Sequence, residues 1–150
     1  GFHMTKGTAL ITGASGGIGL ELARIFAAQN YNLVLVARSE NKLREIANEL
    51  QQHHNVTIRV LAKDLSQPSA PDEIFHELQA QNIPVDVLVN NAGFGSYGPF
   101  WETPLDNELQ LLQLNIVALT HLTKLFLPGM RQRRKGKILN VASTAAFQPG

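Results

Sequence analysis

A glycine-rich run near the amino terminus has the residue types best suited to bind a phosphate. Seven residues make it up: Gly13, Ala14, Ser15, Gly16, Gly17, Ile18 and Gly19. A β-prone run precedes it at residues 8–12, and apolar residues at helical spacing follow it. Glycines let a phosphate approach backbone N–H groups that a Cβ would block, and the following helix adds its partial positive charge. The run therefore predicts the phosphate-binding turn of a dinucleotide site.

Two other motifs use glycines of this kind. A nucleoside-triphosphate loop needs Lys followed by Ser or Thr after the glycines, and the sequence has neither at that point. Residues 13–17 do match Gly-x-Ser-x-Gly, the nucleophile elbow of α/β-hydrolases. That elbow requires an oxyanion-hole loop upstream, for which a motif on the first strand leaves no room. A hydrolase is therefore the remote alternative.

Arg38 occupies the position that selects between the two nicotinamide cofactors in dinucleotide-binding folds. It directly follows an apolar run at residues 32–37. An acid there hydrogen-bonds a free 2′-hydroxyl, whereas an arginine accommodates a 2′-phosphate through several charge-assisted donors. Arg38 therefore favours NADP(H) over NAD(H). Glu40 nearby argues in the other direction, and a solvated arginine at a strand end is the alternative.

The elements that must position these residues alternate along the chain. Five β-prone runs cover residues 8–12, 32–37, 56–61, 85–89 and 137–141. Helical patterns separate them: Ser39 is an expected N-cap, Ser69 with Asp72 resembles a capping box, and Thr103-Pro104 begins a helix that ends at about Leu127. Strands alternating with helices predict an α/β fold, a doubly wound parallel sheet of the Rossmann type.

The longest predicted helix carries two apolar stripes. One consists of Leu105, Leu109, Leu112, Ile116 and Leu119, and the other of Leu111, Leu114, Ala118, Leu122 and Leu125. A helix that covers one face of a sheet needs only one stripe. The second stripe requires another partner, either a later helix or a second subunit, and this favours a homo-oligomer, a dimer or a tetramer.

Four motifs occur in the same order and on the same elements as in the short-chain dehydrogenase/reductase family. They are Thr12-Gly13-x-x-x-Gly17-Ile18-Gly19, Asn90-Asn91-Ala92-Gly93, Asn115, and the strand at residues 138–143. On these motifs the chain resembles that family along all of its length after Met4. The resemblance implies strand order 3-2-1-4-5 and an oxidoreductase that transfers hydride between NADP(H) and a small carbonyl or alcohol substrate.

The resemblance also assigns cofactor contacts beyond the glycines and Arg38. Asp64 would hydrogen-bond the adenine amino group, and the backbone at Leu65 would contact the ring. Asn91, Ala92 and Gly93 would let the backbone approach the ribose and nicotinamide. An Asx-type turn at Asp64 is compatible with that role or could replace it.

Two catalytic residues follow from the same resemblance. Ser143 would hydrogen-bond the substrate carbonyl or hydroxyl, with Thr144 as the alternative hydroxyl. Asn115 would hold a water molecule that connects the catalytic lysine to solvent. The family's catalytic Tyr and Lys are expected shortly after Gly150, so the chain as given is expected to be inactive and to lack the later strands. A non-catalytic nucleotide-binding module is the alternative.

Composition sets the remaining expectations. The 150 residues include 13 Lys or Arg against 12 Asp or Glu, for a net charge of +1, and no Cys. The balanced charge favours no nucleic-acid or membrane partner, and no segment suggests a membrane span. The lack of Cys excludes disulfides and thiolate catalysis and fits a cytoplasmic location. His53-His54 has no third ligand nearby, so no metal site is expected.

The ends of the sequence carry expectations of their own. Residues 1–3 precede Met4 and resemble a remnant of an expression tag. Residues 4–150 are expected to form the dinucleotide-binding part of a longer single domain.

Overall fold

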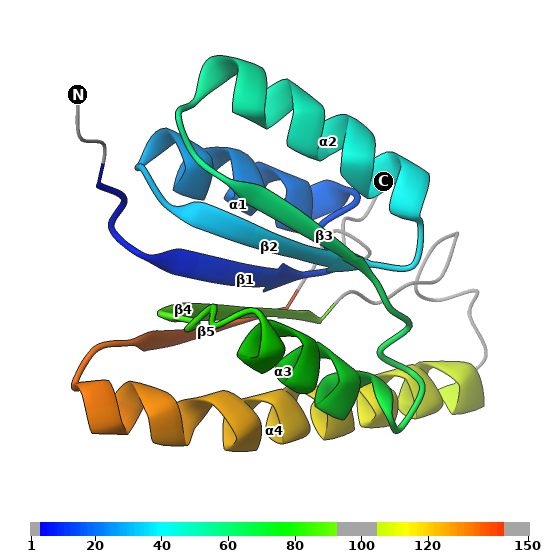
Figure 1. Ribbon diagram of the computed structural model, residues 1–150. Coiled ribbons are helices and arrows are strands. Elements are labelled where there is room, and N and C mark those ends of the chain that lie inside the picture. Colours follow the sequence, from blue (N-terminus) through cyan, green and yellow to red (C-terminus); the bar gives the residue numbers. More distant parts are fainter. Residues whose placement is uncertain (1–3, 93–104, 143–150) are drawn as a thin grey trace.

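One parallel sheet of order β3-β2-β1-β4-β5 organises the molecule (Figure 1). The computed structural model describes residues 4–92 and 105–142. The strands are β1 (Thr8–Thr12), β2 (Asn32–Ala37), β3 (Ile58–Ala62), β4 (Val87–Ala92) and β5 (Lys137–Ala142). The helices are α1 (Gly17–Ala28), α2 (Glu40–His53), α3 (Ala70–Ala80) and α4 (Leu105–Arg133). The predicted fold class and strand order are confirmed.

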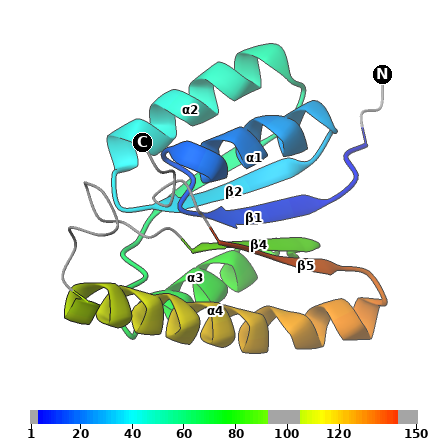
Figure 2. The same ribbon diagram turned by 180° about the vertical axis from the view of Figure 1, so that it is seen from behind.

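Helices cover both faces of the sheet. Figures 1 and 2 show α1 and α2 on one side and α3 and α4 on the other. Successive residues of β1 pack to opposite sides: Ala9 and Ile11 belong to the core under α1 and α2, and Leu10 to the core under α3 and α4. Burial on both faces explains why the central strands are almost continuously apolar.

Of two predicted helix starts, one is confirmed and the other is wrong. Ser39 caps α2, since its Oγ accepts a hydrogen bond from the Lys42 N–H at 3.3 Å. The capping box at Ser69 and Asp72 is wrong. Ser69 has helical backbone angles, φ −82° and ψ −14°, and makes no side-chain cap. Its Oγ instead donates to Glu73 Oε1 at 3.3 Å, one residue beyond the expected partner.

The end of α4 also differs from the prediction. The helix continues past Leu127 and Pro128 to Arg133. A proline inside a helix removes one hydrogen bond and usually ends it. Here the last turns are held in place because Met130 is buried against the sheet and Arg133 Nη2 donates to the Val85 carbonyl at 3.1 Å.

Two strands begin later than predicted. β3 starts at Ile58 rather than at residue 56, and β4 starts at Val87 rather than at residue 85 and continues to Ala92. The Asn32 side chain explains the first shift, since its Oδ1 accepts the Thr57 N–H at 2.8 Å and keeps that donor out of the β2–β3 ladder.

The two apolar stripes of α4 differ in burial: residues of the second are buried against the sheet, and residues of the first are exposed. Ala118 and Leu122 of the second stripe are buried against the sheet. On the first stripe Leu105, Leu109 and Ile116 are 69%, 52% and 53% exposed. Residues 103–104, the expected start signal of this helix, lie outside the described residues.

The expectation that no segment suggests a membrane span needs correction for α4. An 18-residue window of this helix reaches a mean hydropathy of 1.3, so length and composition alone would allow it to cross a membrane. Only 17% of that window is buried, and α4 packs on α3, β4 and β5.

Candidate functional site

The site expected from the sequence lies at one edge of the sheet. All five strands are parallel, so their carboxyl ends meet at the same edge. The glycine run follows β1, Arg38 follows β2, Asp64 follows β3, and Asn91 is near the end of β4. Ligands of open parallel sheets bind at this edge.

Positive φ angles and close packing shape the glycine loop. Gly13 and Gly17 have φ of +61° and +56°, a region that side chains disfavour. A Cβ at Gly19 would overlap the carbonyl oxygen of Gly13. The Ala14 N–H donates to the Val36 carbonyl at 3.2 Å, and the Ala14 side chain is fully buried. Ala14 and Gly19 are buried and build the turn, whereas Gly13 and residues 15–18 are open to a cofactor.

The amino terminus of α1 is open to a ligand. Its N-cap residue, Gly16, makes no side-chain cap, and the first turn contains no acid. A Cβ at Gly16 or Gly17 would meet nothing within 4 Å. Free N–H donors, the positive end of the helix dipole and open space form a cradle for a pyrophosphate. These residues fit the dinucleotide cofactor expected from the sequence.

Thr12 connects the glycine loop to β4, a role that was not predicted. Its Oγ1 donates to the Val89 carbonyl at 3.3 Å and accepts the Asn91 N–H at 3.0 Å. Asn91 Nδ2 in turn donates to the Gly13 carbonyl at 3.4 Å. The sequence signal for this role was the hydroxyl of Thr12 at the end of the apolar run at residues 8–12. These bonds fix Asn91 against the loop.

The side chain of Asn90 has a structural role. Its Nδ2 donates to Asn140 Oδ1 on β5 at 3.1 Å and to Thr123 Oγ1 on α4 at 3.4 Å. Its amide therefore joins β4 to the neighbouring strand and helix.

A small cavity next to Asn115 contains unpaired acceptors. It has a volume of about 30 Å³ and is lined by Thr12, Asn90, Asn91 and Asn115, among others. The side-chain oxygens of Asn90 and Asn91 are buried and have no hydrogen-bond partner among the described residues. Buried polar atoms usually find partners, and this volume has room for one water molecule. The arrangement offers a water site beside Asn115.

Arg38 and Asp64 form the polar end of the site. Arg38 is exposed, and the Lys63 N–H donates to the carbonyl of Ala37 just before it at 2.9 Å. Asp64 Oδ1 accepts the Ser66 hydroxyl at 2.7 Å and the Ser66 N–H at 3.0 Å, which confirms the Asx-type turn. These bonds, with a smaller contribution from the positive charge of Arg38, hold the pKa of Asp64 below its ordinary value.

Four predicted site residues remain to be placed, and two of them are described by the structure. Leu65 is half-buried and lines the cavity next to Asn115. Ala92 is the last residue of β4. Gly93 and Ser143 lie outside the described residues.

Fold and site together define a nucleotide-binding α/β domain of the Rossmann type. The family model described as short chain dehydrogenase matches residues 7–150, and the chain belongs to this family. It is 37% identical over 145 residues to the very-long-chain 3-oxoacyl-CoA reductase of Rattus norvegicus. That match covers 94% of this chain and 46% of the rat enzyme, so the chain spans less than half the length of this relative.

Solved structures show the same similarity. The L-sorbose reductase of Gluconobacter frateurii, complexed with NADPH and L-sorbose, superposes with a TM-score of 0.81 at 34% identity, over 98% of this chain and 56% of that chain. A short-chain dehydrogenase from Sphingobium yanoikuyae in complex with NADPH gives a TM-score of 0.78 at 35% identity, over 95% and 56%.

Proposed function

We propose that this chain forms the NADP(H)-binding part of an oxidoreductase that transfers hydride between the cofactor and a carbonyl or alcohol substrate. The observation that carries the proposal is the open, uncapped amino terminus of α1 behind the glycine loop. Thr12 and Asn91 fix this cradle to β4. The very-long-chain reductase and L-sorbose reductase named above support a carbonyl substrate of the whole protein.

The cofactor preference rests on Arg38. Its exposed guanidinium follows β2 at the edge that holds the glycine loop and would pair with a 2′-phosphate. The positive charge of Arg38 contributes to the lowered pKa of Asp64, but the Asp64 carboxylate already accepts two hydrogen bonds from Ser66. The guanidinium thus keeps donors for a phosphate. Two similar structures that contain NADPH support the choice.

The chemistry divides between the cofactor and this chain. Bound NADP(H) supplies or accepts the hydride. Ser143 would hydrogen-bond the substrate oxygen, and Asn115 would hold a water molecule in the cavity that it shares with Asn90 and Asn91. The unpaired oxygens of those two asparagines give the water acceptors for its own protons. Proton transfer then needs groups outside the 150 residues, so we expect no turnover from this chain alone.

The exposed stripe of α4 supports self-association of the whole protein. Leu105, Leu109 and Ile116 are each more than half exposed, and Leu112 of the same stripe is 39% exposed. Apolar area of this kind is favourably removed from water by a second copy of the helix.

Turnover by the whole protein tests the proposed activity. We expect NADPH to be oxidised in the presence of carbonyl compounds from a panel of ketones, sugars and 3-oxoacyl thioesters. Ser143→Ala should lower kcat by about a hundredfold, while the Kd for NADPH stays unchanged. NADPH binding without turnover on any carbonyl or alcohol would instead favour the non-catalytic nucleotide-binding module.

A further inference from the structure

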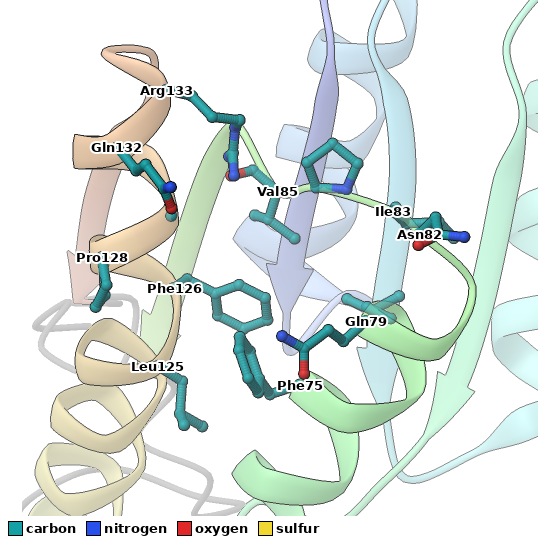
Figure 3. Close-up of a pocket in the computed structure, with 13 residues that line it drawn as sticks. Phe75, Gln79, Asn82, Ile83, Val85, Leu125, Phe126, Pro128, Gln132 and Arg133 are labelled. Atoms are coloured by element: carbon teal, nitrogen blue, oxygen red, sulfur yellow. The ribbon is translucent and has the colours of Figure 1, made fainter.

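A second cavity lies between α3 and α4, away from the glycine loop. Its volume is about 510 Å³, and Figure 3 shows side chains from both helices and from the segment before β4 around it. Val85 precedes β4 and Arg133 precedes β5, so the cavity is at the amino ends of these strands. The dinucleotide cradle is at the carboxyl ends. The two sites are therefore separated by the length of the sheet.

The cavity is built like a ligand site. Ligand pockets generally have volumes of about 300–1,000 Å³ and a mostly apolar lining with few polar groups. Phe75 and Phe126 meet edge to face inside it, with ring centroids 5.3 Å apart and planes at 74°. Leu125, Ile83 and Val85 add aliphatic surface (Figure 3). An apolar chain or ring would be removed from water against these residues.

A single charged residue stands at its rim. Of the 13 residues that line the cavity, Arg133 alone is charged. Its Nη2 donates to the Val85 carbonyl at 3.1 Å and is 3.8 Å from Asp86 Oδ1. Its Nη1 lies above Gly129, where a Cβ would come within 2.9 Å of it. These contacts hold the guanidinium beside the cavity. Both use Nη2, so Nε and Nη1 remain as donors for a ligand.

The charge beside the cavity is not balanced. Asp86 Oδ1 is shared between Arg133 at 3.8 Å and Lys135 Nζ at 3.9 Å. The other oxygen of Asp86 accepts the Thr8 N–H at 3.0 Å. One carboxylate faces these two cations, and Lys6 and Lys137 line the same small hollow as Asp86 and Lys135, so positive charge is in excess. A ligand with a negative charge would reduce this excess.

We propose that this cavity binds a small amphipathic carboxylate. The carboxylate pairs with the guanidinium of Arg133, and the apolar part of the ligand contacts Phe75 and Phe126. The amides of Gln79 and Gln132, on opposite sides of the cavity, are further donors at its rim (Figure 3). The site is independent of the dinucleotide cradle and of the proposed reaction.

Isothermal titration of the whole protein with octanoate tests the proposal, with 1-octanol as the neutral match. We expect octanoate to bind more tightly than octanol. Arg133→Gln should weaken octanoate binding about tenfold, because it removes a charge-assisted hydrogen bond. Arg131→Gln, a neighbouring exposed arginine outside the lining, should leave octanoate binding unchanged.

Gln79→Trp is the second variant. Gln79 is exposed on α3, so an indole there fills the cavity without disturbing the core and should abolish octanoate binding. The Kd for NADPH should be the same in all variants, which separates this proposal from the cofactor site. Equal affinities for octanoate and octanol, no octanoate binding to the wild type, or wild-type affinity in Gln79→Trp would overturn the proposal.

Discussion

The backbone of Gly19 is packed directly on that of Gly13, at the turn between β1 and α1. A Cβ at position 19 would overlap the Gly13 carbonyl oxygen and lie 2.8 Å from its carbonyl carbon. Both atoms belong to the backbone, so no side chain can rotate to make room. This contact sets how closely α1 approaches the sheet and therefore where the N–H groups of its first turn point.

Gly19→Ala should consequently destabilise the protein and disrupt the cradle. Overpacking a rigid site costs about 1–3 kcal/mol, and we expect the upper end of that range in denaturant unfolding. Gly16→Ala is the matched control. Its φ of −172° suits any residue and nothing lies within 4 Å of the added Cβ, so its unfolding free energy should change by less than about 1 kcal/mol. Equal losses in the two variants would contradict this role of Gly19.

The hydroxyl of Thr12 should matter to the cofactor site as well as to stability. Thr12→Val keeps the shape of the side chain but leaves the Asn91 N–H without its acceptor, which should cost about 1–3 kcal/mol. We expect weaker NADPH binding in Thr12→Val, because Asn91 is then free to leave the Gly13 carbonyl. Thr12→Ser retains the hydroxyl and should keep the wild-type Kd. Unchanged NADPH binding in Thr12→Val would show that this link does not shape the site.

The turn at Asp64 has a defined pH dependence. Its pKa lies below the ordinary value, chiefly because of the Ser66 hydroxyl, so the stabilisation is present when the carboxylate is ionised. It should be lost as the pH falls below about 4 and through the lowered pKa of the folded state. Ser66→Ala should raise the pKa of Asp64 in an NMR titration of its carboxyl carbon. Ser69→Ala, which affects Glu73 instead, should not.

Self-association through α4 can be tested with one pair of matched substitutions. Ile116 and Ile25 are similarly exposed, at 53% and 50%, but only Ile116 lies on the apolar stripe. Light scattering of the whole protein should show an oligomer that Ile116→Glu dissociates and Ile25→Glu does not. A monomeric wild type would mean that another segment of the protein covers the stripe.

Local patterns were sufficient to predict most of the fold. Apolar runs at 8–12 and 32–37 coincide with β1 and β2 because both strands are covered on both faces. The glycine loop and Arg38 could be predicted because each combines a residue type with a position after a strand. The same holds for the cap at Ser39, whose hydrogen bond spans three residues.

Features that depend on distant contacts were missed. The role of Thr12 requires the register between β1 and β4, whose bonded residues are 77 and 79 apart in the sequence. The extension of α4 past Pro128 depends on Met130 meeting the sheet and on Arg133 reaching Val85. The cavity beside Arg133 arises from the packing of α3 on α4, which periodicity within either helix does not reveal.

The affinity of the whole protein for NADPH relative to NADH tests the central claim most directly. Titration of the wild type should give a lower Kd for NADPH, Arg38→Gln should remove the difference, and Arg38→Asp should reverse it. Arg44→Gln, which removes an exposed arginine paired with Glu40 on α2, should leave the wild-type preference intact. Equal binding of the two cofactors by the wild type, or an unchanged preference in Arg38→Gln, would contradict the role of Arg38, and no binding of either would contradict the dinucleotide site itself.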